Sequence, residues 1–109
     1  METNKAIAAL AALAQESRLS AFRLLVQAGP EGLSASRIAE ALKIPSSSLS
    51  FHLKELTHAG LVVPRQQGRF ILYAARFDTM DALLGFLTEN CCGGNPCSPL
   101  PSSCCAAGA

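Results

Sequence analysis

The chain has 109 residues, of which 50% are hydrophobic and 16% are charged, and its formal net charge is +1. This length fits one small domain, and this balance of apolar and charged residues excludes an intrinsically disordered chain. No apolar run approaches the roughly 18 residues of a membrane span, so no membrane partner is expected.

The charges are unevenly distributed along the chain. Residues 1–42 carry four basic and four acidic side chains, whereas residues 43–76 carry five basic side chains and one acidic one. Residues 77–109 contain three acidic side chains and no Lys or Arg. A basic middle segment in a nearly neutral chain indicates a surface for a polyanion such as DNA. An ordinary solvated surface is the alternative that charge alone leaves open.

Two helices are predicted at the start of the chain. Residues 3–14 form a helix that is apolar nearly all round, and such a helix must be covered on most sides. In a chain this small, a partner subunit is the expected cover. A second helix is predicted over residues 18–28, with Ser17 as its N-cap and Gly29 at its end. Its apolar residues recur at helical spacing and are expected to lie in the core: Leu19, Phe22, Leu25 and Val26.

The next two predicted helices are short and close together in the sequence. Ser34 is the expected N-cap of a helix over residues 35–42. A fourth helix begins at Ser46 or Ser47 and ends near Ala59, with a stripe of leucines as its buried face. Two short helices joined by a tight turn form a helix-turn-helix.

A β-hairpin and a last helix follow. Two strand-like runs, residues 61–66 and 70–76, flank a short segment with a glycine, which is typical of a hairpin. Asp78 is the expected cap of a helix over about residues 79–89. The apolar seam of this helix suits pairing with the first helix of both subunits. The fold class is therefore mostly α with one β-hairpin.

The fourth helix carries polar side chains opposite its leucine stripe. A helix that reads the major groove needs such hydroxyl, imidazole and ammonium groups. Two arginines flank the hairpin tip, where an extended arm can reach phosphates or the minor groove. The candidate DNA-binding residues are Ser46, Ser47, Ser48, Ser50, Phe51, His52, Lys54, Arg65 and Arg69. The alternative is that the serines cap the helix and that Phe51 belongs to the core.

Over about residues 8–89 the sequence resembles the ArsR/SmtB family of metal-responsive winged-helix repressors. The matching motifs are LAQESRLSAFRLL at 13–25, IAEALKIPSSSLSFHLKELTHAGLV at 38–62 and GRFILYAA at 68–75. The resemblance implies a winged helix-turn-helix fold and a homodimer built by the first and last helices. It also places Ser46 to Lys54 on the recognition helix and Arg65 to Arg69 in the wing. The implied partner is a near-palindromic operator with half-sites about 10–10.5 base pairs apart, or a multiple of that. The implied activity is repression of transcription and not catalysis.

All five cysteines lie in the last 19 residues: Cys91, Cys92, Cys97, Cys104 and Cys105. An odd number with two vicinal pairs is a poor disulfide framework, so thiol chemistry in a reducing cytoplasm is expected. Residues 6–14 imitate the apolar part of a secretory signal, but they are short and mostly alanine. We expect residues 1–90 to form the DNA-binding and dimerisation domain and residues 91–109 to form a flexible tail with the inducer site.

The cysteines point to a thiophilic inducer. The best-known arsenic sensors of the family carry Cys-x-Cys on the third helix, where this chain has Ser34 to Arg37. The zinc, nickel or cobalt sites of relatives use His with Asp on the last helix, which has no His here. Soft thiolates favour thiophilic ions, and arsenite prefers three of them. The predicted ligands are Cys91, Cys92 and Cys97, with Cys104 or Cys105 as possible substitutes. Arsenite, antimonite or methylarsenite would then release the repressor from DNA, and no permanent cofactor is expected.

Other roles for the tail stay open at this point. Vicinal thiols oxidise to strained, labile bonds, so a winged-helix repressor that senses oxidants or reactive sulfur is one alternative. A zinc site and a tail without function are two more. A thiol oxidoreductase or a metal-sequestering protein would explain the tail alone. The sequence lacks the Cys-x-x-Cys, the phosphate-binding glycine loop and the paired nucleophile and His that enzymes of these kinds need.

Overall fold

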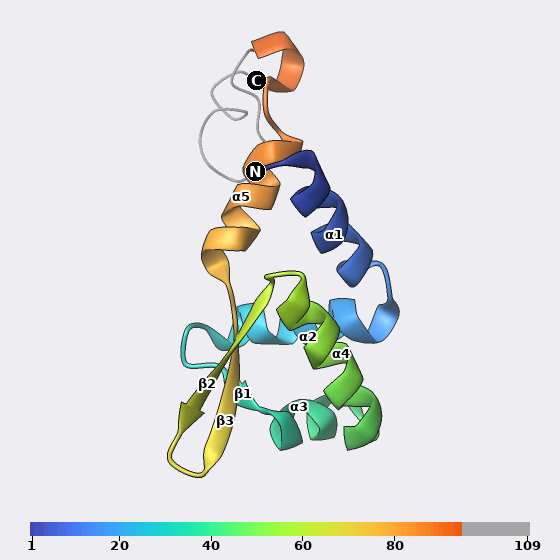
Figure 1. The fold of residues 1–109 in the computed structure, drawn as a ribbon, viewed down its shortest axis with the longest axis vertical. Coiled ribbons are helices and arrows are strands. Elements are labelled where there is room, and N and C mark those ends of the chain that lie inside the picture. Colours follow the sequence, from blue (N-terminus) through green and yellow to red (C-terminus); the bar gives the residue numbers. More distant parts are fainter. Residues whose placement is uncertain (95–109) are drawn as a thin grey trace.

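The computed structural model describes residues 1–94, and its elements follow the predicted order with two additions, a short strand and a 3-10 turn (Figure 1). They are α1 (Thr3–Leu13), α2 (Glu16–Ala28), β1 (Leu33–Ser34), α3 (Ala35–Leu42), α4 (Ser46–His58), β2 (Val62–Gln67), β3 (Phe70–Ala75), α5 (Phe77–Leu87) and a 3-10 turn η1 (Cys91–Gly94). The prediction of a mostly α fold with one hairpin is confirmed. None of the helices within residues 1–94 is long and apolar enough to cross a membrane.

The first addition is the short strand β1, which was not predicted from the sequence. The sheet is antiparallel with the order β1-β3-β2, and Leu33 and Ser34 pair with Tyr73 and Leu72. Two residues are too few to show a strand periodicity, so only the pairing with β3 reveals the strand. Because β1 leads directly into α3, it fixes the start of α3 beside the hairpin.

The core lies where α2, α3, α4 and the base of the hairpin meet. Its fully buried side chains include Leu25 from α2, Ile38 from α3, and Leu53 and Leu56 from α4. Leu61, at the entry to β2, is also completely buried. The predicted leucine stripe of α4 is therefore confirmed, and its burial fixes the opposite face of α4 toward solvent.

Two predicted helix caps are wrong. The helix α2 begins at Glu16, because the side chain of Gln15 accepts a hydrogen bond from the Arg18 amide at 2.9 Å, so Ser17 lies inside the helix. The helix α5 begins at Phe77, and Asp78 lies in its first turn. The Asp78 carboxylate pairs with Arg76 at 3.1 Å, and this hydrogen-bonded guanidinium lowers the pKa of the carboxyl. The Asp78 side chain therefore pairs with Arg76 and does not cap α5.

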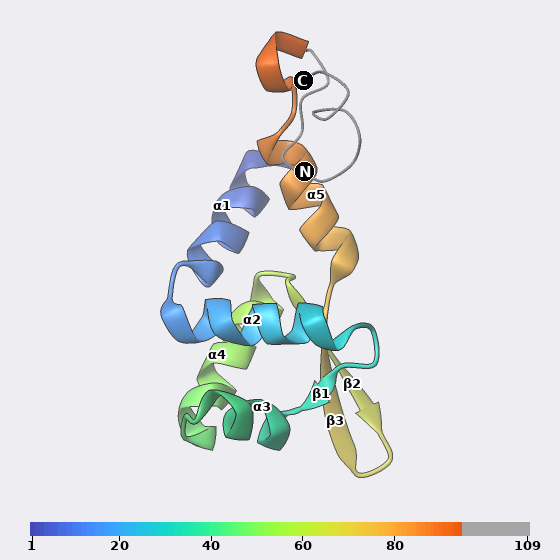
Figure 2. The ribbon, with the colours of Figure 1, turned by 180° about the vertical axis from the view of Figure 1, so that it is seen from behind.

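The helices α1 and α5 project from the core at the end opposite the hairpin tip (Figures 1 and 2). The helix α1 packs inside the subunit through its alanines, since Ala6, Ala9 and Ala12 are buried, and Leu83 is the buried residue of α5. The larger side chains of α1 stay outside: Ile7 is 58% exposed and Leu10 is 42% exposed. No cover for these side chains comes from within residues 1–94.

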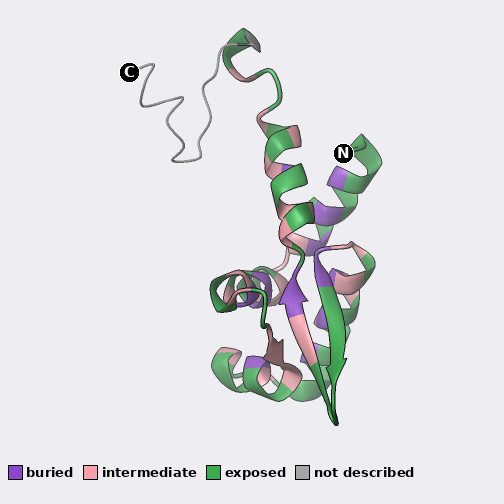
Figure 3. Ribbon diagram, turned by 90° about the vertical axis from the view of Figure 1, so that its left-hand side faces the viewer, coloured by how far each residue is buried: buried purple, intermediate pink, exposed green. Residues whose placement is uncertain are grey.

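The exposed apolar surface extends beyond α1. Leu87 on α5 is 55% exposed, and Leu19 on α2 is 43% exposed. The expectation that Leu19 belongs to the core is therefore wrong, because its side chain lines an open apolar hollow with Phe22 of α2 and Met80 of α5. The burial colours of Figure 3 show how α5 and α1 mix buried and exposed residues along their lengths.

Gly32 offers a test of how β1 meets β3. Its φ is +74°, and a Cβ there would lie 2.9 Å from the carbonyl carbon of Tyr73. Gly60, with φ +78°, has open space at the same position, so Gly60→Ala carries only the left-handed backbone cost of roughly 1–2 kcal/mol. We expect Gly32→Ala to lose about 1–3 kcal/mol more than that, because the backbone of β3 must move. Urea denaturation at one protein concentration measures both, and equal losses would contradict the close approach.

Candidate nucleic-acid interface and cysteine site

The hairpin tip, α3 and the beginning of α4 lie together at one end of the molecule (Figures 1 and 2). The α5 helix and the N-terminus lie at the other end. In helix-turn-helix proteins the second helix places its N-terminal residues against bases, while the first helix crosses the backbone. The arrangement of α3 and α4 has this form, with the hairpin as a wing beside it.

The exposed face of α4 carries the predicted polar residues. Ser46, Ser47, Ser48, Ser50 and Lys54 are all exposed, on the side away from the leucine stripe. None of these serines caps the helix, because the N-cap is Pro45 and it makes no side-chain cap hydrogen bond. The hydroxyls therefore remain available to an external partner.

The aromatic residues of α4 differ in exposure. Phe51 is 56% exposed, so the alternative that it belongs to the core is wrong. His52 is half-buried, with its ring edge-on to Phe51 at a centroid distance of 5.8 Å. The Nδ1 atom of His52 is buried and has no hydrogen-bond partner within residues 1–94. Phe51 thus presents an apolar contact surface next to the serines.

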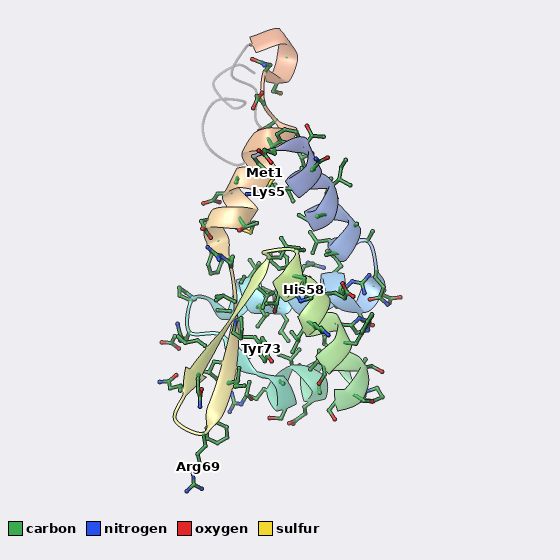
Figure 4. The ribbon with its side chains drawn as sticks, in the orientation of Figure 1. Met1, Lys5, His58, Arg69 and Tyr73 are labelled. Carbon is green, nitrogen blue, oxygen red and sulfur yellow. The ribbon has the colours of Figure 1, made fainter. Side chains whose placement is uncertain are left out.

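The wing ends in a two-residue turn. Gln67 pairs with Phe70, and Gly68 is the first turn residue with φ +64°. Arg69 is the second, and its side chain extends beyond the tip into solvent (Figure 4). Arg65 is exposed as well, and one guanidinium nitrogen donates to the Glu31 carbonyl at 3.2 Å. This bond holds Arg65 beside the loop before β1 and leaves most of its five donors for other acceptors.

Two further residues at this end did not emerge from the sequence as DNA contacts. Arg37 on α3 and Phe70 on β3 are both exposed, and they border one hollow between α3 and the wing. They are 33 positions apart in the sequence, so no local pattern connects them. The pairing of β1 with β3, a long-range contact, brings them together.

Cys91 and Cys92 lie in η1, which residues 88–90 separate from the end of α5 at Leu87. The Cys91 amide donates to the Thr88 carbonyl at 2.9 Å, and the Thr88 hydroxyl donates to the Leu84 carbonyl at 2.8 Å. The two Sγ atoms are 3.5 Å apart, well beyond the roughly 2.05 Å of a disulfide. The backbone of Cys91 is therefore connected to the end of α5 by hydrogen bonds.

The predicted three-cysteine site extends beyond the part of the chain that the structure describes. Cys97, Cys104 and Cys105 lie outside residues 1–94. Within those residues, no group of three or more His, Cys, Asp or Glu side chains forms a metal site. The ligand set for arsenite stays a prediction, of which the structure describes two members.

Comparison with known proteins agrees with this architecture. The helix-turn-helix domain family matches residues 13–65. The uncharacterized HTH-type transcriptional regulator YceK of Bacillus subtilis (strain 168) is 39% identical over 77 residues, which are 70% of this chain and 76% of that protein. A putative arsenical resistance operon repressor ArsR of Halobacterium salinarum is 37% identical over 67 residues, which are 62% of this chain and 51% of that protein.

Solved structures share the same fold. An ArsR-like transcriptional regulator from Rhodococcus sp. RHA1 superposes with a TM-score of 0.71 at 28% identity, over 79% of this chain and 78% of that one. A homodimeric winged helix-turn-helix DNA-binding domain from Mycobacterium bovis belongs to a possible ArsR-family regulator. It superposes with a TM-score of 0.64 at 26% identity, over 80% of this chain and 81% of that one. Sequence, fold and these relatives together show that the chain belongs to the ArsR family of winged-helix, DNA-binding transcriptional regulators, and not to a family of enzymes.

Proposed function

We propose that this protein is a homodimeric repressor that leaves its operator when cysteine thiolates beyond α5 bind arsenite. The observation that carries the proposal is that the subunit has two different kinds of groups at its opposite ends. Exposed polar and basic groups of α4 and the wing lie at one end, and two thiols lie close together at the other, shortly after α5.

The DNA end supplies both kinds of contact that recognition needs. In the proposed complex α4 enters the major groove, where the hydroxyls of the four serines and the ring of His52 meet base edges. Phe51 is exposed and suits contact with a thymine methyl group. Lys54 binds phosphate, while Arg65 and Arg69 on the wing reach phosphates or the adjacent minor groove.

The exposed apolar side chains of α1 and α5 favour a second copy of the chain as their cover. Ile7, Leu10 and Leu87 are too exposed to stabilise the isolated subunit. Burying apolar surface contributes roughly 25 cal/mol per Å², so covering these side chains favours association. The Mycobacterium bovis relative is homodimeric. A two-fold dimer places its two α4 helices in successive major grooves of a near-palindromic operator.

The thiol end suits a soft, three-coordinate ion. Two thiolates whose sulfurs lie 3.5 Å apart supply two ligands, and Cys97 is the proposed third, with Cys104 or Cys105 as substitutes. Antimonite and methylarsenite share this preference for thiolates. The relative from Halobacterium salinarum, a putative arsenical resistance operon repressor, supports the same assignment.

Coupling between the two ends runs along α5. An ion shared by Cys91, Cys92 and Cys97 pulls on the Cys91 backbone, whose amide donates a hydrogen bond to the Thr88 carbonyl just beyond α5. Because α5 belongs to the proposed dimer interface, this pull alters the angle between the subunits and the spacing of the two α4 helices. A coupling of about 1–3 kcal/mol weakens operator binding by roughly 5- to 150-fold.

A sensor of oxidants or reactive sulfur is the second candidate. The observation in its favour is that two sulfurs already lie 3.5 Å apart, so that modest movement brings them to bonding distance. Arsenite under reducing conditions and peroxide without reductant separate the two functions in an operator-release assay. Release by peroxide alone would replace arsenite as the effector.

Lys54→Ala tests the DNA face. The substitution removes one phosphate contact from each subunit of the proposed dimer. We expect weaker binding to all sequences alike, and a slope of log K against log salt that is less steep by about 1.8, which is about 0.9 for each of the two contacts. Lys5→Ala is the matched control, since it removes the same charge from α1 at the other end. Fluorescence anisotropy with the upstream DNA of the gene measures both. If the two variants behave alike, α4 is not the DNA-binding helix.

Leu10→Glu tests the dimer face. We expect a charge at this exposed apolar position to raise the dimer dissociation constant at least about tenfold, which corresponds to roughly 1.4 kcal/mol. Ala8→Glu places the same charge on an exposed position of another side of α1 and should leave the dimer intact. Sedimentation equilibrium measures both variants. Unchanged association of Leu10→Glu would exclude this surface as the interface.

Single Cys→Ser variants test the inducer site. Replacement of Cys91, Cys92 or Cys97 is expected to abolish release by arsenite because each removes one of three ligands. Replacement of Cys104 or Cys105 is expected to leave the response intact. Operator retention in a gel-shift titration with arsenite provides the measurement. A protein truncated after residue 90 that still responds to arsenite would rule out the tail as sensor.

A further inference from the structure

A hollow of about 290 Å³ lies between the wing and the start of α3. Leu72 and Phe70 of β3 form its apolar wall, and Gln67 of β2 lies beside them. Arg37 and Ser34 border it from α3 and β1. The hollow therefore has one apolar side and one cationic side.

Phe70 has no evident role in stabilising the subunit. Along one face of β3, Ala74 is buried, Leu72 is half-buried and Phe70 is 67% exposed. The row of apolar side chains thus continues beyond the edge of the core toward the tip of the wing. An aromatic ring left in water gains free energy when a partner covers it, and Phe70 is one of the largest such groups at this end.

Arg37 is similarly unengaged. Its guanidinium makes no ion pair or hydrogen bond within residues 1–94, whereas its backbone amide donates to the Ser34 hydroxyl at 3.4 Å and so caps α3. The cap fixes the first turn of α3, and the pairing of Ser34 with Leu72 fixes that turn beside β3. The two sides of the hollow are consequently held in place before any ligand arrives.

We propose that this hollow seats one sugar–phosphate unit of the operator backbone, an inference that rests on the proposed DNA-binding function. A deoxyribose-phosphate has an apolar sugar and an anionic phosphate, which match the two sides of the hollow. Phe70 and Leu72 pack on the sugar carbons, and the Arg37 guanidinium binds the phosphate oxygens with its forked donors.

The location favours DNA as the occupant. The hollow lies between α3 and the wing, at the same end as the exposed face of α4 and the Arg69 side chain (Figures 1 and 4). It is therefore continuous with the surface proposed to contact the operator. A strand that passes from the groove occupied by α4 to the groove reached by the wing crosses this position. The contact adds register and affinity and reads no base.

Two variants separate the sugar contact from the phosphate contact. Arg37→Ala removes one phosphate contact from each subunit, so it is expected to weaken operator binding and to make the salt slope less steep by about 1.8, about 0.9 for each contact. Phe70→Ala is expected to weaken binding about tenfold with no change in slope, because it removes apolar contact and no charge. Both effects should be equal on operator and on non-specific DNA, since neither contact reads sequence.

Matched controls keep the test specific. Ile71→Ala removes an apolar side chain that is 48% exposed on the opposite face of β3, and Lys5→Ala removes one positive charge far from the hollow. Both should bind DNA like the unmodified protein. Thermal melting of each variant at one protein concentration verifies that the fold and dimer survive, so that a loss of binding is assigned to the contact.

The outcomes are distinct. Wild-type affinity and slope for Arg37→Ala and Phe70→Ala, with Lys54→Ala still weakened, would overturn the hollow as a backbone site and leave the DNA-binding function standing. A flattened slope for Arg37→Ala with no effect of Phe70→Ala would overturn the sugar contact. If the unmodified protein fails to bind DNA, the proposed function and this inference both fall.

Discussion

The DNA-binding face of α4 depends on one constraint, which is the burial of the leucine stripe on the opposite side of the helix. Leu49, Leu53 and Leu56 fill the space between α2, α3 and the base of the hairpin, and they can do so in only one rotation of the helix. A helix held in this way must direct its serines, Phe51 and Lys54 outward, since side chains alternate around the axis with a period of 3.6 residues. The DNA-facing chemistry of α4 thus follows from the packing of its opposite face.

The small size of the chain explains its other faces. A single domain of this length can build only a modest apolar core. The helix α1 contributes to this core mainly through alanines, whose small side chains allow close helix packing. The larger apolar groups of α1 and α5 are left on the outside. The small core of the subunit therefore leaves apolar side chains on the surface that is proposed to contact a second subunit.

The separation of the two ends constrains how the proposed inducer could act. Cys91 and Cys92 lie in η1, where the Cys91 amide bonds to Thr88 at the C-cap of α5, while α4 and the wing lie at the opposite end of the molecule. In the proposed mechanism an ion at the thiols does not touch DNA, so it would act only through a difference in its affinity for two arrangements of the proposed dimer. The hydrogen bonds from Thr88 to Leu84 and from Cys91 to Thr88 form a continuous path into α5.

The sequence by itself determined the order and type of the long elements, the leucine stripe of α4 and the polar set opposite it. Helical periodicity and turn residues are local properties, so they can be recognised without the fold. The caps at Ser17 and Asp78 were wrong because stronger local partners, Gln15 with the Arg18 amide and Arg76 with Asp78, compete in the folded chain.

Only the tertiary structure decided which apolar residues remain exposed and which distant residues meet. Leu19 follows a core periodicity yet lies at the edge, because burial depends on what packs against a helix and not on its own pattern. Arg37 and Phe70 border one hollow through β1, a strand of two residues without a sequence signature. This pairing joins residues that are distant in the sequence and exists only in the assembled sheet. No local sequence pattern could therefore predict it.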